Sequence, residues 1–321
     1  MDLDVIDPAS WLRRGLLGVS RNDSLRSVIE SAPVSRDVVS RFVAGAGNDQ
    51  AVEVASSLHS TGRLVTLDYL GEDTADPQMA QDTKRVYLDL IGALADRGLT
   101  SGGKVEVSLK LSALGQALEQ DGEQIALDNA REICRAAANA DTTVTLDMED
   151  YSTTDLTLSA QRELRQDWPW VGAVLQSYLY RTEQDCRDLA YEGSRVRLCK
   201  GAYKQPESVA YQDKSEVDKS YVRCLKILMQ GQGYPMVATH DPRMIEIAGV
   251  LADRGQRAAD SFEYQMLLGI RPDEQQRLAD TGARVRVYTP YGEEWYGYLV
   301  RRMAERPANL AFFVRAVATT G

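Results

Sequence analysis

The chain has 321 residues, with 37 basic and 47 acidic side chains and a formal net charge of −10. This acidic balance, without a basic cluster, argues against nucleic acid as the main partner. The two histidines, His59 and His240, exclude a histidine-rich metal centre, and the four cysteines form no CxxC pair, a pattern that suits a reducing cytosol.

The first 60 residues read as helical. Amphipathic runs follow Ser24, Ser35 and Asn48, and each of these residues is of the type that caps a helix N-terminus. The sequence therefore predicts an N-terminal helical arm over residues 1–62.

From residue 63, strand-like and helix-like runs alternate. The strand-like runs are 64–67, 104–111, 143–147, 171–176, 195–199, 235–239, 261–264 and 284–288. The helix-like runs lie near 74–97, 121–140, 153–167, 181–193, 213–231, 241–254, 272–280 and 292–305. Eight such alternations are typical of a (β/α)8 TIM barrel, here over residues 63–321, and a doubly wound sheet is the alternative.

Polar residues gather at or near the ends of the predicted strands. They are Lys110, Asp147, Gln176, Arg197, Lys200, Thr239, His240, Glu263, Gln265 and Tyr288. Because the chemistry of a (β/α)8 barrel lies at the C-terminal ends of its strands, we expect these side chains to converge on one mouth. Burying so many polar groups would cost several kcal/mol each without partners, which favours a functional site.

Two motifs narrow the chemistry. Arg301 and Arg302, in YLVRRMAE, form a two-pronged clamp suited to a small carboxylate such as an amino acid. In RLCKGAY, Lys200 and Gly201 follow a strand end, where positive charge and an unobstructed backbone suit a cofactor phosphate or a reduced flavin. A Schiff-base lysine, Lys110 or Lys200, fits equally well, so a flavin barrel, an aldolase-like barrel and a non-catalytic binding barrel all remain open.

A series of longer strings resembles the proline dehydrogenase family in its monofunctional bacterial form. In chain order they are VSLKLSALG (107–115), TLDMEDY (145–151), VLQSYLYRT (174–182), RVRLCKGAYKQPE (195–207), VATHDPRMI (237–245), FEYQMLLGI (262–270), RVYTPYGEEWYGYLVRRMAE (286–305) and NLAFFVRA (309–316). The resemblance covers roughly residues 40–316. It implies a distorted (β/α)8 barrel that binds FAD noncovalently and oxidises L-proline to Δ1-pyrroline-5-carboxylate, with electrons passing to a quinone.

The resemblance also implies roles for the substrate side of the site. Arg301 and Arg302 would hold the proline carboxylate, and Lys110 would lie beside the substrate. Asp147 would support the closed site through a charged hydrogen bond. Tyr288 would pack on the proline ring and favour proline over hydroxyproline.

On the cofactor side, the resemblance implies that Arg197 lies near flavin N5 and stabilises the reduced, anionic flavin. The other implied flavin contacts are Met148, Gln176, Cys199 (through its backbone), Lys200, Gly201, Thr239 and His240. Lys204 and Leu268 depart from the bifunctional members, which usually carry an aromatic residue and often a histidine there.

The location and partners are also expectations at this point. The chain opens acidic, without a basic and apolar leader, and contains no stretch of about 18 uncharged apolar residues. We therefore expect a cytoplasmic protein, with peripheral contact at the inner face of the cell membrane where a quinone would be reached. No aldehyde dehydrogenase segment follows, so a separate pyrroline-5-carboxylate dehydrogenase is expected to take the product.

Overall fold

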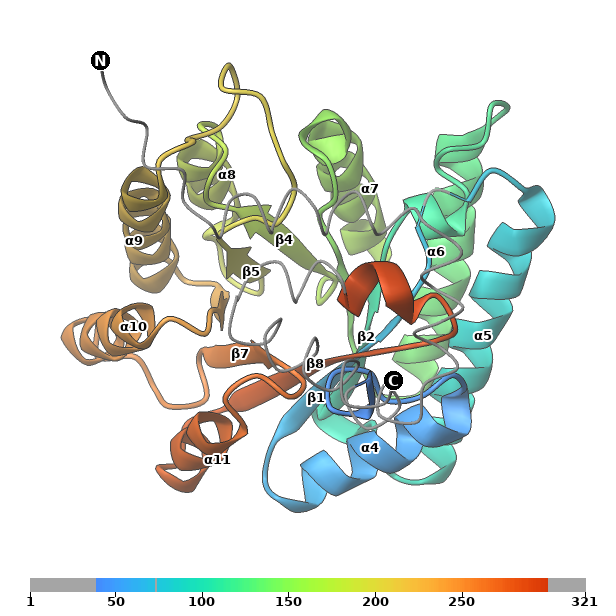
Figure 1. Ribbon diagram of the computed structural model, residues 1–321, viewed down its shortest axis with the longest axis horizontal. Coiled ribbons are helices and arrows are strands. Elements are labelled where there is room, and N and C mark those ends of the chain that lie inside the picture. Colours follow the sequence, from blue (N-terminus) through green and yellow to red (C-terminus); the bar gives the residue numbers. More distant parts are fainter. Residues whose placement is uncertain (1–38, 73, 300–321) are drawn as a thin grey trace, which may run out of the picture.

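Eight parallel strands form a closed barrel in chain order, from β1 to β8 (Figure 1). This computed structural model describes residues 39–72 and 74–299. The strands are β1 (Leu64–Tyr69), β2 (Val105–Leu109), β3 (Val144–Leu146), β4 (Gly172–Gln176), β5 (Arg195–Cys199), β6 (Tyr234–Ala238), β7 (Glu263–Leu267) and β8 (Val285–Tyr291). The predicted (β/α)8 barrel is confirmed, and the doubly wound sheet is excluded because β1 pairs with β8.

Helices alternate with the strands and surround the barrel (Figure 1). They are α5 (Pro77–Asp96), α6 (Gly122–Asn139), α7 (Thr154–Asp167), α8 (Thr182–Leu189), α9 (Lys214–Gln230), α10 (Pro242–Arg254) and α11 (Pro272–Asp280). Several begin at a cap visible in the sequence. Asp213, for example, accepts hydrogen bonds from the backbone N–H groups of Ser215 (2.8 Å) and Glu216 (3.1 Å) at the start of α9.

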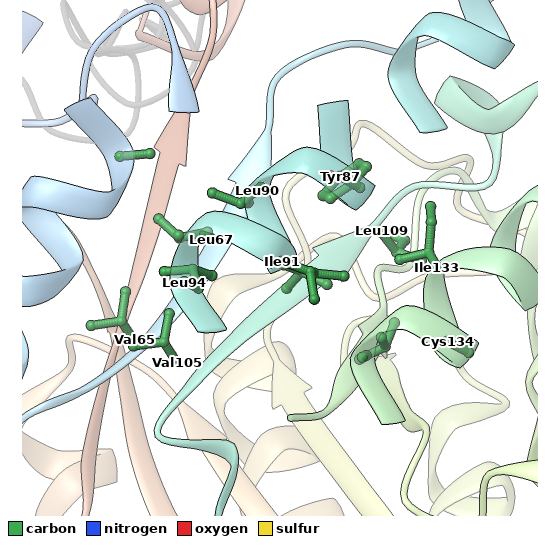
Figure 2. Close-up of a cluster of buried hydrophobic side chains, with 14 of the residues drawn as sticks. Val65, Leu67, Tyr87, Leu90, Ile91, Leu94, Val105, Leu109, Ile133 and Cys134 are labelled. Carbon is green, nitrogen blue, oxygen red and sulfur yellow. The ribbon is translucent and has the colours of Figure 1, made fainter. Parts of the chain in front are cut away.

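The apolar core lies between the strands and the helices. Figure 2 shows one part of it, where Val65 and Leu67 of β1 lie with Leu90 and Leu94 of α5. All four side chains are buried. The residues that alternate with Val65 and Leu67 point into the barrel instead, as the two-residue period of a strand requires.

The end of the barrel interior at the start of the strands is ionic. We call Glu106, Arg195, Glu263 and Arg286 the basal quartet. Arg195 Nη2 lies 2.6 Å from Glu106 Oε2, and Arg286 Nε lies 2.7 Å from Glu263 Oε1. Grouping Glu263 with the mouth was wrong: Glu263 is the first residue of β7, so its side chain lies near the opposite end of the barrel.

A helix that precedes the barrel, α4 (Asn48–Ser60), packs on β1, β8 and α5. Its buried face belongs to the same core cluster as β1. The predicted capping role of Asn48 was wrong, because Gly47 is the cap residue and Gln50 Oε1 accepts from Ala46 N at 2.7 Å. The division into an arm (1–62) and a barrel (63–321) stays a prediction, since much of the arm lies outside the described residues.

A second apolar cluster lies at the C-terminal end of the barrel. Leu70, directly after β1, and Ile270, shortly after β7, pack with Phe42, Tyr296 and Leu299. The described part of the last predicted helix covers residues 295–299. This cluster therefore covers one side of the mouth. Within residues 39–72 and 74–299, no helix is long and apolar enough to cross a bilayer.

Candidate active site

Asp147 lies at the centre of the mouth, directly after β3. Its backbone N–H donates to Leu109 O at 2.8 Å, which aligns the residue with the end of β2. Its two carboxylate oxygens receive different donors: Arg197 Nη1 reaches Oδ1 at 2.5 Å, and Tyr288 Oη reaches Oδ2 at 2.6 Å. One carboxylate thus joins residues from three separate strand regions, all of which the sequence analysis had singled out.

Arg197 is buried inside the barrel. The Tyr288 ring lies against its guanidinium, with 5.0 Å from the Arg197 carbon Cζ to the ring centroid, a cation–π arrangement. Burial opposes ionisation of Arg197, but Asp147, Tyr288 and Glu106 together outweigh it, so the pKa of Arg197 lies above its usual value. Burial and then the Asp147 charge raise the pKa of Tyr288 well above 10. At neutral pH the site therefore holds a permanent cation beside a phenol that keeps its proton.

Lys110 forms the second charged pair of the mouth. Its Nζ lies 2.7 and 2.8 Å from the two carboxylate oxygens of Asp68, which is in β1. Burial raises the pKa of Asp68 to about 6, although the neighbouring Lys110 lowers it. Burial opposes charging of Lys110, but Asp68 and Asp147 raise its pKa above the usual value. The pair is therefore ionised at neutral pH.

Gln176 lies at the end of β4 and holds the segment that follows β3. Its amide Nε2 donates to the backbone carbonyls of Met148 (3.3 Å) and Glu149 (3.2 Å). Its Oε1 is buried and has no hydrogen-bond partner among the described residues. Arg197 Nη2 is likewise buried without a hydrogen-bond partner there, and it lies in an ion pair 3.7 Å from Glu106 Oε1 of the basal quartet, so Gln176 Oε1 is the unused polar atom of the two.

The segment after β5 carries Cys199, Lys200 and Gly201. Lys200 forms ion pairs with Asp218 and, at 3.2 Å, with Asp241, so its charge is directed toward the starts of α9 and α10. Gly201 has a φ of +112°, and a Cβ there would lie 2.5 Å from the Tyr178 ring. Glycine is thus required by backbone conformation and by Tyr178, whereas contact of Lys200, Gly201 or Cys199 with a cofactor stays a prediction.

Thr239 and His240 follow β6. Thr239 Oγ1 accepts from Asp241 N at 3.1 Å, and His240 Nε2 accepts from Leu267 N at 2.9 Å. Since His240 Nε2 acts as an acceptor, the ring carries its proton on Nδ1. Both side chains therefore fix backbone at the mouth, and their predicted flavin contacts stay untested.

The structure brings together some of the predicted residues and leaves others apart. Asp147, Arg197 and Tyr288 form one group connected by hydrogen bonds. Lys110 lies near this group and interacts electrostatically with Asp147. Lys204 is exposed on the segment before α9. The predicted clamp residues, Arg301 and Arg302, lie outside the described residues.

Three residues of the mouth were missed from the sequence or given no role. Asp68 pairs with Lys110, Ser108 Oγ accepts from Arg197 Nη1 at 3.1 Å, and Gln265 Oε1 accepts from Arg197 Nε at 2.6 Å. A signal was present in each case: Ser108 is a polar residue within the strand-like run 104–111, and Asp68 and Gln265 directly follow the runs 64–67 and 261–264, at alternate positions that face inward. What the sequence lacked was the pairing of strands that brings β2, β5 and β7 together.

The fold and the mouth define an enzyme-like (β/α)8 barrel with a charged interior. The protein-family comparison then matches residues 51–315 to the model described as "Proline dehydrogenase". "Proline dehydrogenase 1" of Bacillus subtilis (strain 168) is 40% identical over 306 residues, which is 95% of this chain and 99% of the relative. "Proline dehydrogenase" of Deinococcus radiodurans is 40% identical over 283 residues, covering 88% and 90%. The chain belongs to the proline dehydrogenase family.

A solved structure gives an independent comparison of the fold. The chain resembles the crystal structure of proline utilization A (PutA) from Bdellovibrio bacteriovorus, inactivated by N-propargylglycine, with a TM-score of 0.76 and 28% identity. The match covers 84% of this chain and 32% of that one, so the chain spans about a third of that relative. The resemblance to the family inferred from the sequence strings is confirmed.

Proposed function

We propose that the chain oxidises L-proline to Δ1-pyrroline-5-carboxylate, the first step of proline catabolism, with noncovalently bound FAD as the hydride acceptor. The observation that carries this proposal is the hydrogen-bonded group formed by Asp147, Arg197 and Tyr288 at the C-terminal mouth of the barrel. It supplies a fixed cation, a matched carboxylate and a phenol donor in the place where barrel enzymes carry out their chemistry.

An unpaired acceptor near the mouth fits a flavin. The pyrimidine edge of a flavin ring offers an N–H group, which needs an acceptor from the protein. Gln176 Oε1 is a buried acceptor without a hydrogen-bond partner among the described residues. Buried polar atoms are normally paired, which supports a ligand at this position.

When bound, FAD would supply a two-electron acceptor for hydride from the carbon next to the proline nitrogen. The protein would contribute charge and position. Arg197 stays protonated, so it would stabilise negative charge on a reduced flavin, and Asp147 keeps Arg197 in place. Tyr288 presents its ring at the mouth, where the proline ring is predicted to pack. Lys110, Arg301 and Arg302 are proposed to hold the substrate, with the two arginines on its carboxylate.

The Schiff-base alternative is disfavoured by the two lysines themselves. Such a lysine must lose its proton to attack a carbonyl, and a lowered pKa is the usual way to achieve this. Lys110 has a raised pKa because Asp68 and Asp147 surround it. Lys200 is held by Asp218 and Asp241 in ion pairs directed toward α9 and α10.

We also propose that a quinone takes up the electrons and that a separate pyrroline-5-carboxylate dehydrogenase uses the product. A cytoplasmic location with peripheral membrane contact would give the protein access to both the quinone and the separate dehydrogenase. These proposals rest on the family, in which the chain matches single-function relatives over nearly their whole length.

Anaerobic addition of L-proline to the purified protein tests the proposed function. We expect yellow protein with an absorbance band near about 450 nm that bleaches when proline is added. D-Proline serves as the control, because it has the same functional groups with the opposite configuration at the α-carbon. Flavin that stays oxidised at high L-proline would contradict the proposal, and a colourless protein that forms a borohydride-trapped lysine adduct would establish the Schiff-base alternative.

A further inference from the structure

Gln265 lies between the mouth and the basal quartet. It is the middle residue of β7, its side chain is buried, and it has two short hydrogen bonds. Its Oε1 accepts from Arg197 Nε at 2.6 Å, and its Nε2 donates to Glu263 Oε1 at 2.6 Å. One neutral amide thus connects the cation of the mouth with a carboxylate below it.

The orientation of this amide is fixed by Glu263. If the amide turned over, its NH2 would face the Arg197 N–H and its oxygen would face the Glu263 carboxylate, and both contacts would be repulsive. Glu263 in turn is held by Arg286 (2.7 Å) and by the Tyr234 hydroxyl (2.9 Å). Burial opposes ionisation of Glu263, but Arg286 outweighs it, and its pKa lies below the usual value.

Arg197 needs this second attachment. Asp147 and Ser108 both contact Nη1, so together they hold one end of the guanidinium. Glu106 attracts Nη2 from 3.7 Å, which is too far for a hydrogen bond. Without a partner on Nε, the plane of the guanidinium could swing about Nη1. The bond to Gln265 fixes the plane through a second nitrogen, and the neutral amide adds no charge that would weaken Arg197 as a cation.

We propose that Gln265 is a positioning residue for Arg197, and that Glu263 sets the orientation of its amide. This inference rests on the proposed function, since it assigns the orientation of Arg197 to flavin binding and reduction. The structure of β7 explains the arrangement: Glu263 and Gln265 are two residues apart and face the same side of the strand, one above the other.

Gln265→Met tests the role, because methionine keeps the length of the side chain and removes the acceptor. We expect the rate of flavin reduction at saturating proline to fall at least ten-fold, with KM changed less than three-fold. We also expect the preference of the protein for reduced over oxidised flavin to fall about ten-fold. This change lowers the midpoint potential of the bound flavin by about 30 mV for a two-electron couple. The dissociation constant for FAD, from flavin fluorescence, gives a readout independent of turnover.

Tyr234→Phe is the matched control, because it removes a hydrogen bond to the same Glu263 without touching Gln265 or Arg197. Because Arg286 still holds Glu263, this variant should lower the melting temperature but slow flavin reduction less than three-fold. Gln265→Glu keeps an oxygen facing Arg197, and its carboxyl would share a proton with Glu263. At low pH, Gln265→Glu should reduce flavin nearly as fast as the wild type. The rate should fall as the shared proton is removed, so the pH profile of the variant gains a new inflection.

The outcomes separate the two proposals. Bleaching of the wild type by proline, with Gln265→Met matching its reduction rate, potential and FAD affinity within two-fold, would overturn the positioning role alone. The absence of bleaching in the wild type would overturn the proposed function and the role of Gln265 with it. If Gln265→Met does not fold, a Gln265→Glu pH profile identical to the wild type overturns the positioning role.

Discussion

Lys110 and Asp68 lie beside the group formed by Asp147, Arg197 and Tyr288, and their charges depend on one another. Asp68 has a pKa of about 6, so below that pH the folded protein favours its neutral form. Lys110 then loses the counter-charge that holds its Nζ by two hydrogen bonds. Above that pH the pair is intact. A residue proposed to lie beside the substrate is thus held only while its partner stays ionised.

The expected result is an acid limb in the activity profile. We expect kcat/KM for proline to fall below about pH 6 with an inflection that belongs to Asp68, in addition to the inflection from the proline amine at higher pH. In Asp68→Asn the acid inflection should disappear, and kcat/KM should be lower throughout because Lys110 lacks its partner. Initial rates between pH 5 and about 9 provide the measurement. An unchanged inflection in the variant would assign it to another group.

The sequence predicted Asp147, Arg197 and Tyr288 as site residues but not how they connect. Their positions followed from the strand-end rule, which needs only the strand boundaries. The three hydrogen bonds of Arg197 depend on how β2, β3, β5 and β7 are brought together across the barrel, and local patterning carries no information on that. Glu263 shows the same limit, because a strand-like run at 261–264 did not reveal that Glu263 begins the strand.

At the scale of elements, some helix and strand boundaries were predictable because the two-residue period of strands and the 3.6-residue period of helices are both strong. The predicted helix 272–280 matches α11, and the predicted strand 195–199 matches β5. The start of α4 was harder, since Asn48 and Gly47 are both plausible caps. The side chain of Gln50 decides the matter by turning back to accept from Ala46 N and Gly47 N.

The segment between β5 and α9 allows a test of whether the contact with Tyr178 makes glycine necessary at position 201. Gly201→Ala would place a methyl group against the Tyr178 ring in a left-handed conformation, so we expect a loss of at least about 2 kcal/mol in stability and weaker FAD retention. Gly193→Ala is the control, because its φ is +77° but nothing lies within 4 Å of the added Cβ. It should cost about 1 kcal/mol and leave FAD retention unchanged. Urea unfolding and flavin content measure both, and equal losses would remove Tyr178 from the explanation.

At the scale of the whole molecule, the barrel has two kinds of interior. The space between strands and helices is apolar (Figure 2), while the space enclosed by the strands holds ion pairs from the basal quartet to the mouth. Buried ion pairs contribute little net stability when intact, but removing one partner leaves a charge without compensation. We therefore expect single substitutions of charged residues inside the barrel to lower the stability of the protein strongly.

Glu106→Gln tests this sensitivity. Burial disfavours the Glu106 carboxylate, but Arg195, Arg286 and Arg197 outweigh it, and its pKa lies below the usual value. Its stabilising contribution is present above the ordinary carboxyl pKa and is lost as the pH falls through the lowered value. At neutral pH we expect the variant to lose about 3–5 kcal/mol in urea unfolding.

The control is the exposed pair of Arg97 with Glu53, at 2.7 Å. Arg97→Ala should cost less than about 1 kcal/mol, because solvent screens that pair. If Glu106→Gln and Arg97→Ala have the same effect, the basal quartet is not a sensitive element of the fold.

The basal quartet also constrains how this barrel can change over generations. The loss of any one of its four charges leaves another charge without its partner. A change at Glu263 should therefore require a change at Arg286 at nearly the same time in evolution. Substitutions at these two positions should therefore occur jointly among relatives, with an acid and a base exchanged for two neutral residues. The same should hold for Glu106 with Arg195, and a collection of aligned sequences would reveal it as covariation.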